Sequence, residues 1–244
     1  SQADRLQCAF EVVGLDEPTV LDLVLDDATA VLNCAGPFSR TWEPMVEACL
    51  RTGTHYLDIT GEISVFEALH ERGDEAAQAG VMLLPGVGFD VVPTDCLAAH
   101  LAERCPDADA LSLAFYAEHG VSRGTVKTMV EHADDGGAVR RDGRIEDVSL
   151  AHETRTVDFG WGHDGVHTAA IPWGDVSTAY HTTGIPNVTV YTEMSETAVR
   201  TQRAAGLLSP LLSVPQVNAG LQWLVEQTMT GPDADERATA HSYV

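Results

Sequence analysis

Glycine, proline and small polar residues end three short apolar runs in the first part of the sequence, at residues 33–38 (NCAGPF), 58–62 (DITGE) and 84–94 (LPGVGFDVVPT). Gly36 lets the backbone approach a flat or charged group closely, and Pro37 stiffens the turn. If the runs are neighbouring parallel strands, their carboxyl ends share one edge of the sheet, where such sheets bind ligands. The alternative is that these residues only mark turns, as they do in every fold. We favour a binding edge because all three segments fall on one rim.

Few side chains could act on a bound substrate. Residues 122–125 (SRGT) precede a helical pattern, so free backbone amides and Arg123 can receive an anion or polarise a carbonyl. The plainer interpretation is an N-cap beside a surface arginine. Tyr180 and His181 are the other candidates for proton transfer, and none of the three is a convincing donor from the sequence.

Two other chemistries are not expected. His163, Asp164 and His167 fall in a glycine-broken turn, where a four-residue histidine spacing does not suit a metal as it does on a helix, so no metal is predicted. No histidine is placed to activate Cys34, which we interpret as a small buried thiol. The five cysteines are odd in number and lack a CxxC pair, which favours core residues over a disulfide framework or a zinc site.

Alternating strands and helices must position this edge, and the pattern up to about residue 105 supplies them. Residues 42–50 place apolar side chains at i, i+3, i+4, i+7 and i+8, which is typical of a helix packed on a sheet. Ser39 or Thr41 can cap that helix. The predicted fold class is α/β, a partial Rossmann-type parallel sheet covered on both faces. Strands are expected at 10–13, 29–33, 55–59 and 81–84, and helices at 20–25, capped by Asp16, at 42–50 and at 65–69.

An α+β region is expected after residue 93. Trp173 can line an apolar pocket, although an ordinary core tryptophan is the alternative. The apolar helical segment 196–229 is broken by Pro210 and Pro215, which argues against a membrane span. Core packing is the default there, and a lid, a homodimer face or a surface for a lipid-like substrate are alternatives. The other expected elements are a helix at 94–104, a strand at 111–117, an Asp-Gly hairpin at 140–143 with two solvated arginines, and a hairpin at 159–165.

The charge balance excludes several partners. Thirty-seven acidic residues face 14 basic ones, for a net charge of −23, which argues against nucleic acid and anionic membranes. Lys127 is the only lysine and the acidic residues are scattered, a pattern typical of halophilic proteins, in which molar salt screens the repulsion between like charges. The alternative is an ordinary acidic protein. Because neither a spanning run nor a signal-peptide order occurs, we predict a cytoplasmic protein.

Five runs, in this order, closely resemble the saccharopine dehydrogenase-like oxidoreductases, particularly their trans-acting enoyl reductase branch: VLNCAGPF, HYLDITGE, LLPGVGFDVVPTD, SRGTVKTMVE and IPWGDVSTAYHTTGIPN. The resemblance extends over nearly the whole chain. It implies a Rossmann domain for NADP or NAD over residues 1–93, and an α+β domain over residues 94–244 that covers the nicotinamide and takes the substrate. It also implies which residues flank the cofactor: Asn33, Ala35, Gly36 and Pro37 beside the half distant from the adenosine, and Asp58, Gly86, Phe89 and Asp90 near the nicotinamide.

The sequence departs from this family in one respect. The family opens with a strand and a glycine-rich phosphate-binding turn, and neither GxGxxG nor GxxGxxG occurs in these 244 residues. We therefore expect an internal fragment that lacks the first two strands, the glycine loop and a C-terminal piece, which would leave residues 10–13 without a partner beside 29–33. Such a fragment is expected to bind the cofactor weakly and to be inactive alone. The residue that would distinguish NADP from NAD is expected in the absent part.

The function implied by the resemblance is hydride transfer from NAD(P) to a C=C or C=N bond. A dicarboxylic imine would need several fixed cations, and Arg123 has no cluster of arginines around it. An uncharged or thioester-linked acyl substrate is therefore favoured. The alternative is a non-catalytic relative that keeps the fold as a binding or scaffold module.

Overall fold

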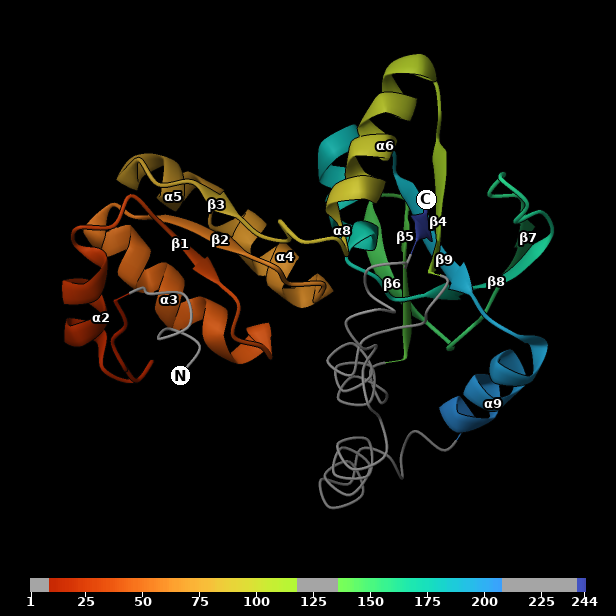
Figure 1. Ribbon diagram of the computed structural model, residues 1–244. Coiled ribbons are helices and arrows are strands. Elements are labelled where there is room, and N and C mark those ends of the chain that lie inside the picture. Colours follow the sequence, from red (N-terminus) through yellow and green to blue (C-terminus); the bar gives the residue numbers. More distant parts are fainter. Residues whose placement is uncertain (1–8, 118–135, 208–240) are drawn as a thin grey trace. The chain divides into compact units, whose positions relative to one another are not determined.

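The computed structural model describes residues 9–117, 136–207 and 241–244, which belong to two compact units, Ser1–Phe89 and Asp90–Val244 (Figure 1). The sequence-based boundary after residue 93 lies close to this division. The predicted helix start at 122–125, with Arg123, and most of the segment 196–229 lie outside the described residues.

The first unit is a parallel sheet with helices between its strands, as the α/β pattern predicted. Its strands are in the order β1-β2-β3 and all pairs are parallel. Left-handed glycines end two of its helices, Gly53 with φ 76° after α3 and Gly80 with φ 69° after α5. The strands are β1 (Ala30–Asn33), β2 (His55–Asp58) and β3 (Leu83–Leu84), and the helices are α2 (Pro18–Leu25), α3 (Phe38–Thr52), α4 (Ile63–Glu71) and α5 (Gly73–Ala79).

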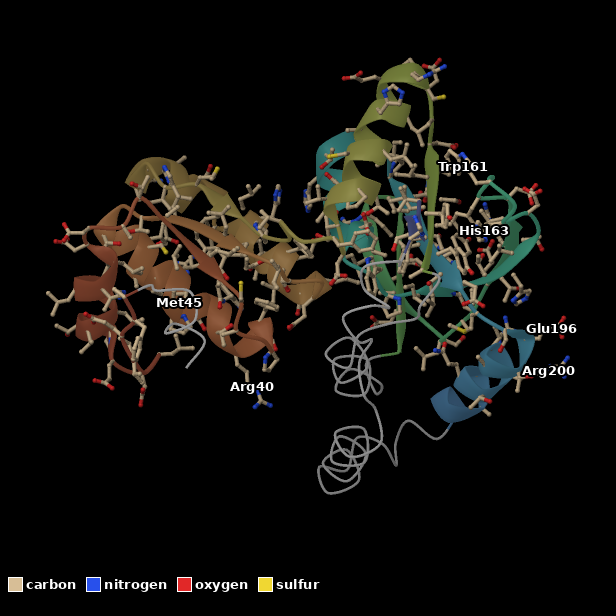
Figure 2. The ribbon with its side chains drawn as sticks, viewed as in Figure 1. Arg40, Met45, Trp161, His163, Glu196 and Arg200 are labelled. Atoms are coloured by element: carbon tan, nitrogen blue, oxygen red, sulfur yellow. The ribbon has the colours of Figure 1, made fainter. Side chains whose placement is uncertain are left out.

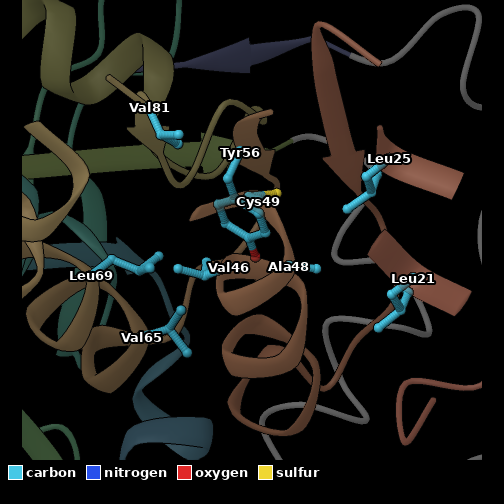
Figure 3. Close-up of a cluster of buried hydrophobic side chains, with 9 residues drawn as sticks. All are labelled: Leu21, Leu25, Val46, Ala48, Cys49, Tyr56, Val65, Leu69 and Val81. Atoms are coloured by element: carbon cyan, nitrogen blue, oxygen red, sulfur yellow. The ribbon is translucent and has the colours of Figure 1, made fainter. Parts of the chain in front are cut away.

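One face of this sheet carries the core of the unit. Tyr56 on β2 is fully buried among side chains from α2, α3 and α4 (Figure 3). The opposite face is open in the described residues, with Leu32 53% and Leu84 43% exposed, so the expectation of a sheet covered on both faces was wrong here. An apolar run shows that a strand can be covered on both sides, and it does not show what covers it. The core cluster consists of Leu21, Leu25, Val46, Ala48, Cys49, Tyr56, Val65, Leu69 and Val81.

Two further expectations for the first unit were wrong. Residues 10–13 are not a strand, and Phe10 and Val12 are 62% and 92% exposed; among the described residues no strand lies beside this segment to pair with it. The residue at the N-cap of α2 is Glu17, not Asp16, and its side chain makes no capping hydrogen bond.

The second unit is an α+β layer. Its strands are in the order β10-β4-β9-β5-β6, with β8 pairing β9 and β7; β4 and β9 are parallel and the other pairs antiparallel. Helices α6 and α8 pack on each other, α6 against β4 and α8 against β5 and β9 (Figure 1). The strands are β4 (Ala110–Ala117), β5 (Gly137–Arg141), β6 (Arg144–Val148), β7 (Thr154–Val157), β8 (Val166–Ile171), β9 (Asn187–Glu193) and β10 (Ser242–Tyr243), and the helices are α6 (Val92–Arg104), α8 (Asp175–Thr183) and α9 (Glu196–Leu207).

Both predicted hairpins are present. Asp142 and Gly143 join β5 to β6 with φ values of 47° and 77°, as a turn with two left-handed residues requires. The expectation that both arginines before this turn are solvated was wrong for Arg140, which is 3% exposed and contacts α8, whereas Arg141 is exposed at the end of the strand. Its guanidinium donates to the carbonyl oxygen of Val176 at 2.9 Å.

The second hairpin joins β7 to β8. Its turn holds Trp161 and His163, labelled in Figure 2, and the His163 ring lies 5.1 Å from that of Tyr116 and 4.5 Å from that of Tyr243. Over residues 9–117, 136–207 and 241–244, no three His, Cys, Asp or Glu side chains are grouped as metal ligands. None of the helices in those same ranges combines the length and the apolar composition needed to cross a membrane.

Candidate functional site

Asn33 ends β1 with its side chain turned into the first unit. The residue is 6% exposed, and its Nδ2 donates to Thr41 Oγ1 at 3.1 Å and to Tyr56 Oη at 3.3 Å. Its Oδ1 accepts the amide hydrogen of Ala35 at 3.0 Å. Asn33 therefore shapes the turn that follows β1, and the backbone of that turn, not the amide side chain, faces outward.

The turn after β1 exposes small residues. Ala35 and Gly36 are exposed, Pro37 is half-buried, and the Thr41 hydroxyl donates to the Ala35 carbonyl at 2.6 Å. A Cβ at Gly36 would meet nothing nearer than the Phe38 ring, at 3.5 Å, which is ordinary contact. Cys34 is also exposed, so its interpretation as a buried thiol was wrong: it follows the inward-facing Asn33 and points the other way.

The first turn of α3 is capped by a residue that the sequence did not suggest. Glu62, at the end of the loop after β2, accepts the amide hydrogens of Phe38 at 2.6 Å and of Ser39 at 2.9 Å, one on each carboxylate oxygen. Neither Ser39 nor Thr41 caps the helix as expected; its N-cap residue is Pro37. The cap comes from more than twenty residues away, and no local capping pattern signals it.

Asp58 ends β2 and is fully buried. Its Oδ1 accepts the amide hydrogens of Thr60 at 3.0 Å and Gly86 at 2.8 Å, and its Oδ2 accepts the Tyr56 hydroxyl at 2.9 Å. Burial raises the pKa of Asp58, and these donors oppose the rise. The Asp58 side chain thus joins the loop after β2 to the loop after β3. A second link between these loops is the Val87 amide, which donates to the backbone carbonyl of Asp58 at 2.8 Å.

The loop after β3 runs along this edge. Gly86 is buried and has φ 71°, a conformation that favours glycine. A Cβ at Gly88 would come within 3.3 Å of Ile59 Cβ, so the two loops pack closely. Phe89 is 57% exposed. The structure therefore brings Asn33, Ala35, Gly36, Pro37, Asp58 and Gly86 to one edge, at the carboxyl ends of the strands.

The remaining candidates belong to the second unit. Asp90 precedes α6; its carbonyl accepts the Trp173 indole hydrogen at 2.6 Å, and burial raises the pKa of its carboxyl. The Tyr180 ring lies under the Arg140 guanidinium at 4.3 Å. Its hydroxyl lies beside the Gly143 turn, where an added Cβ would approach it to 3.2 Å. His181 is exposed and its ring meets that of Tyr180 edge-on at 5.3 Å.

The edge of the first unit fits one part of a dinucleotide. The exposed backbone of Ala35 and Gly36 allows a flat ring to approach closely, with no side chain in the way. The start of α3 would otherwise attract a phosphate, but the Glu62 carboxylate already accepts its first amides. The described residues thus fit a flat ring at this edge and do not offer the α3 terminus to a phosphate.

Comparisons with known proteins agree with this geometry. Residues 3–84 match the family model of the saccharopine dehydrogenase NADP binding domain. A saccharopine dehydrogenase-like oxidoreductase of Rattus norvegicus is 40% identical over 85 residues, which are 34% of this chain and 20% of that protein. A trans-acting enoyl reductase of Mycobacterium leprae is 33% identical over 145 residues, 53% of this chain and 34% of that protein.

A solved structure extends the likeness in fold. Apo saccharopine dehydrogenase (L-Glu forming) from Saccharomyces cerevisiae matches with a TM-score of 0.55 and 16% identity, over 97% of this chain and 61% of that one. The family resemblance and the Rossmann-type α/β fold are thereby confirmed, and the matched domain is one that binds NADP. The matched stretches span a fifth to a third of the length of these curated relatives.

Proposed function

From the premise that residues 3–84 form an NADP-binding domain of the saccharopine dehydrogenase type, we propose that this protein is an NAD(P)-dependent oxidoreductase that reduces a C=C or C=N bond. The observation that carries the proposal is the exposed Ala35–Gly36 backbone at the carboxyl end of β1, the position at which parallel sheets bind such ligands. The bound cofactor supplies the hydride.

The residues of the edge have two roles in this proposal. Ala35, Gly36 and Pro37 form the surface against which the flat part of the cofactor lies. Asn33 and Asp58 act as positioning residues, because their side chains hold the loops and do not face outward. Phe89 would shield the reacting ring from water, and Asp90 would border it, with Arg123, Tyr180 and His181 as the candidates for the proton donor.

The choice of substrate class rests on the arginines. Three arginines in the described part of the second unit are already engaged: Arg140 binds two backbone carbonyls, Arg141 pairs with Glu146, and Arg155 with Glu153. Cations already engaged in this way are poor partners for an incoming dicarboxylate. This supports an uncharged or thioester-linked acyl substrate, such as an enoyl thioester, over a dicarboxylic imine.

Gly36→Val tests the binding edge in the protein purified at its natural length. A side chain at this position meets only ordinary contacts within the chain, so the variant should fold, but the branched side chain would stand where the ring lies. Overpacking of about 1–3 kcal/mol predicts a five- to 150-fold increase in the dissociation constant for NADPH. Gly73→Val at the exposed start of α5, where an added Cβ meets nothing within 4 Å, is the matched control. Equal NADPH affinities for the Gly36 and Gly73 variants would refute the assignment.

NADPH oxidation distinguishes the substrate classes. The protein at its natural length is assayed in molar potassium chloride with enoyl thioesters and, separately, with lysine plus 2-oxoglutarate. Turnover of the thioester alone is the expected result, and turnover of the amino acid pair alone would reverse the preference. Tight NADPH binding without turnover of either substrate would favour a non-catalytic module.

A further inference from the structure

The first turns of α6 and α8 are joined by two buried side chains. Thr94 is 3% exposed and Asp175 is fully buried, and the Thr94 Oγ1 lies 2.5 Å from Asp175 Oδ1. The same hydroxyl lies 3.0 Å from the carbonyl oxygen of Val91. Beside this contact, the Trp173 indole holds the chain just before α6 through the Asp90 carbonyl.

The hydrogens at this contact can be counted. A threonine hydroxyl carries one hydrogen, and a carbonyl oxygen can only accept. If that hydrogen goes to the Val91 carbonyl, as it commonly does for a threonine three residues on, none remains for the 2.5 Å contact with Asp175. In that arrangement two bare oxygens would repel at this distance, so the hydrogen of the second contact comes from Asp175, as a carboxylic acid donating to Thr94.

The other carboxyl oxygen supports the same count. The Oδ2 atom of Asp175 is buried, and no side chain or backbone group in the described part of the chain forms a hydrogen bond with it. A buried carboxylate with a bare oxygen is costly, whereas a neutral carboxyl group leaves its carbonyl oxygen bare at a much smaller cost. Burial raises the pKa of Asp175 to about 7; the contact with Thr94 and the residue's own backbone amide oppose this rise, and nearby Asp95 and Asp90 reinforce it.

We propose that Asp175 is a neutral carboxylic acid whose hydrogen bond to Thr94 fastens α8 to α6, and that its ionisation loosens this junction. The proposal goes beyond the oxidoreductase function and needs neither cofactor nor substrate. It assigns to the junction a sensitivity to pH that an amide at the same position would lack.

The neighbouring acidic residues act on the Asp175 pKa in the same direction as burial. Asp90 and Asp95 oppose ionisation of Asp175, and Asp95 is itself held by the Thr182 hydroxyl at 2.8 Å. On β5, Arg140 directs its guanidinium to the Val176 and Gly143 carbonyls. The other titratable groups of the two helices are His181 and Tyr180 on α8, and Cys96, His100, Glu103 and Arg104 further along α6; β4 and β9 add Tyr116, Tyr191 and Glu193.

Because the pKa of Asp175 in the folded state lies above the ordinary value of an aspartate, the folded state holds this proton when the unfolded state has lost it. The stabilisation is fully present below about pH 4, is lost as the pH rises through about 7, and changes no further above that.

Asp175→Asn tests the proposal, because the amide can donate to Thr94 but cannot ionise. Urea unfolding is followed by hydrogen exchange of α6 and α8 peptides from pH 5 to pH 9, at constant potassium chloride. The ratio of wild-type to variant unfolding constants should rise by up to about tenfold per pH unit below pH 7 and then level off. Asp107→Asn, an exposed acid in the loop after α6, is the matched control. A ratio independent of pH would overturn the proposal.

Infrared spectroscopy gives a second readout that does not depend on unfolding. The carbonyl band of a protonated carboxyl group should be present in the wild type at pH 5.5, decline towards pH 9 and be missing from Asp175→Asn, while the bands of other buried acids cancel in the difference spectrum. If that variant does not fold, Thr94→Val should shift the same band by removing its acceptor. A wild type with no band that responds to either substitution would show that Asp175 is ionised.

Discussion

Glu62 provides a direct test of how the binding edge is built. Its two carboxylate oxygens accept the Phe38 and Ser39 amide hydrogens at 2.6 and 2.9 Å, and the residue is 8% exposed. A hydrogen bond to a charged group contributes about 1.5–3 kcal/mol, and a negative charge at a helix start adds about 0.3–1 kcal/mol. Ser39 is exposed, so water can replace one of the two bonds in a variant. We therefore expect Glu62→Ala to lower the free energy of unfolding of the first unit by about 2–4 kcal/mol.

Glu62→Gln should have a smaller effect. Its amide keeps one acceptor oxygen but turns a donor towards the second backbone amide and lacks the charge, so a loss of about 1–2 kcal/mol is expected. Glu71→Gln, at the exposed last residue of α4 and away from the start of α3, is the matched control and should stay within about 0.5 kcal/mol of the wild type.

The measurement must report on the first unit alone. Urea unfolding in molar potassium chloride, followed by hydrogen exchange of peptides from α3, does so, and the Phe38 and Ser39 amides should lose protection in the variants before the middle of the helix does. If Glu62→Ala and Glu71→Gln have the same stability, the carboxylate does not cap α3, and the argument that it keeps phosphate from this terminus fails.

Three more predictions concern the rest of the chain. Arg140→Lys should lower the free energy of unfolding of the second unit by about 1–3 kcal/mol, because one ammonium group cannot bond both the Val176 and Gly143 carbonyls and lie over the Tyr180 ring. The exposed control Arg141→Lys should lower it by less than about 0.5 kcal/mol, and equal losses in urea unfolding would contradict the prediction. Native alkylation at pH 8, read by mass spectrometry, should modify exposed Cys34, Cys96 and Cys105 but spare Cys49, which is fully buried and whose pKa burial raises to about 11; early labelling of Cys49 would refute its place in the core. The thermal midpoint should rise from dilute buffer to molar potassium chloride as the Debye length falls from about 10 to about 3 Å, and a flat profile would exclude halophily.

Periodicity predicted most elements of the first unit and the beginning of the second, whereas α5 and β9 were not predicted. The 42–50 pattern indicated α3, and the Asp-Gly pair indicated the β5–β6 hairpin, because in each case the signal lies within the element itself. Residues 10–13 failed because a strand depends on a partner that its own residues do not reveal. Arg140 failed for a similar reason, since its burial depends on carbonyls of α8, more than thirty residues away.

The position of the candidate edge could also be predicted, but the roles of its residues could not. Glycine and proline after apolar runs indicated where the strands end, and the structure brings those ends together. Asn33 and Asp58 were expected to meet the ligand, yet their side chains bind the protein's own amides and hydroxyls. A polar residue at a strand end has the same sequence signature in both roles, and only its rotamer and partners distinguish them.

The hydrogen bonds from Asn33 to Tyr56 and from Tyr56 to Asp58 also bear on how the protein can vary over evolution. A relative that replaced Tyr56 by phenylalanine would leave one Asp58 oxygen buried without its donor, and the next tolerated substitution would fall at Asp58 or Asn33. These three positions should therefore change together or not at all, whereas exposed Ala35 can change alone as the bound ring changes. Coupled substitutions along this chain of side chains would record changes in loop structure, and independent ones at the neighbouring turn would record changes in ligand.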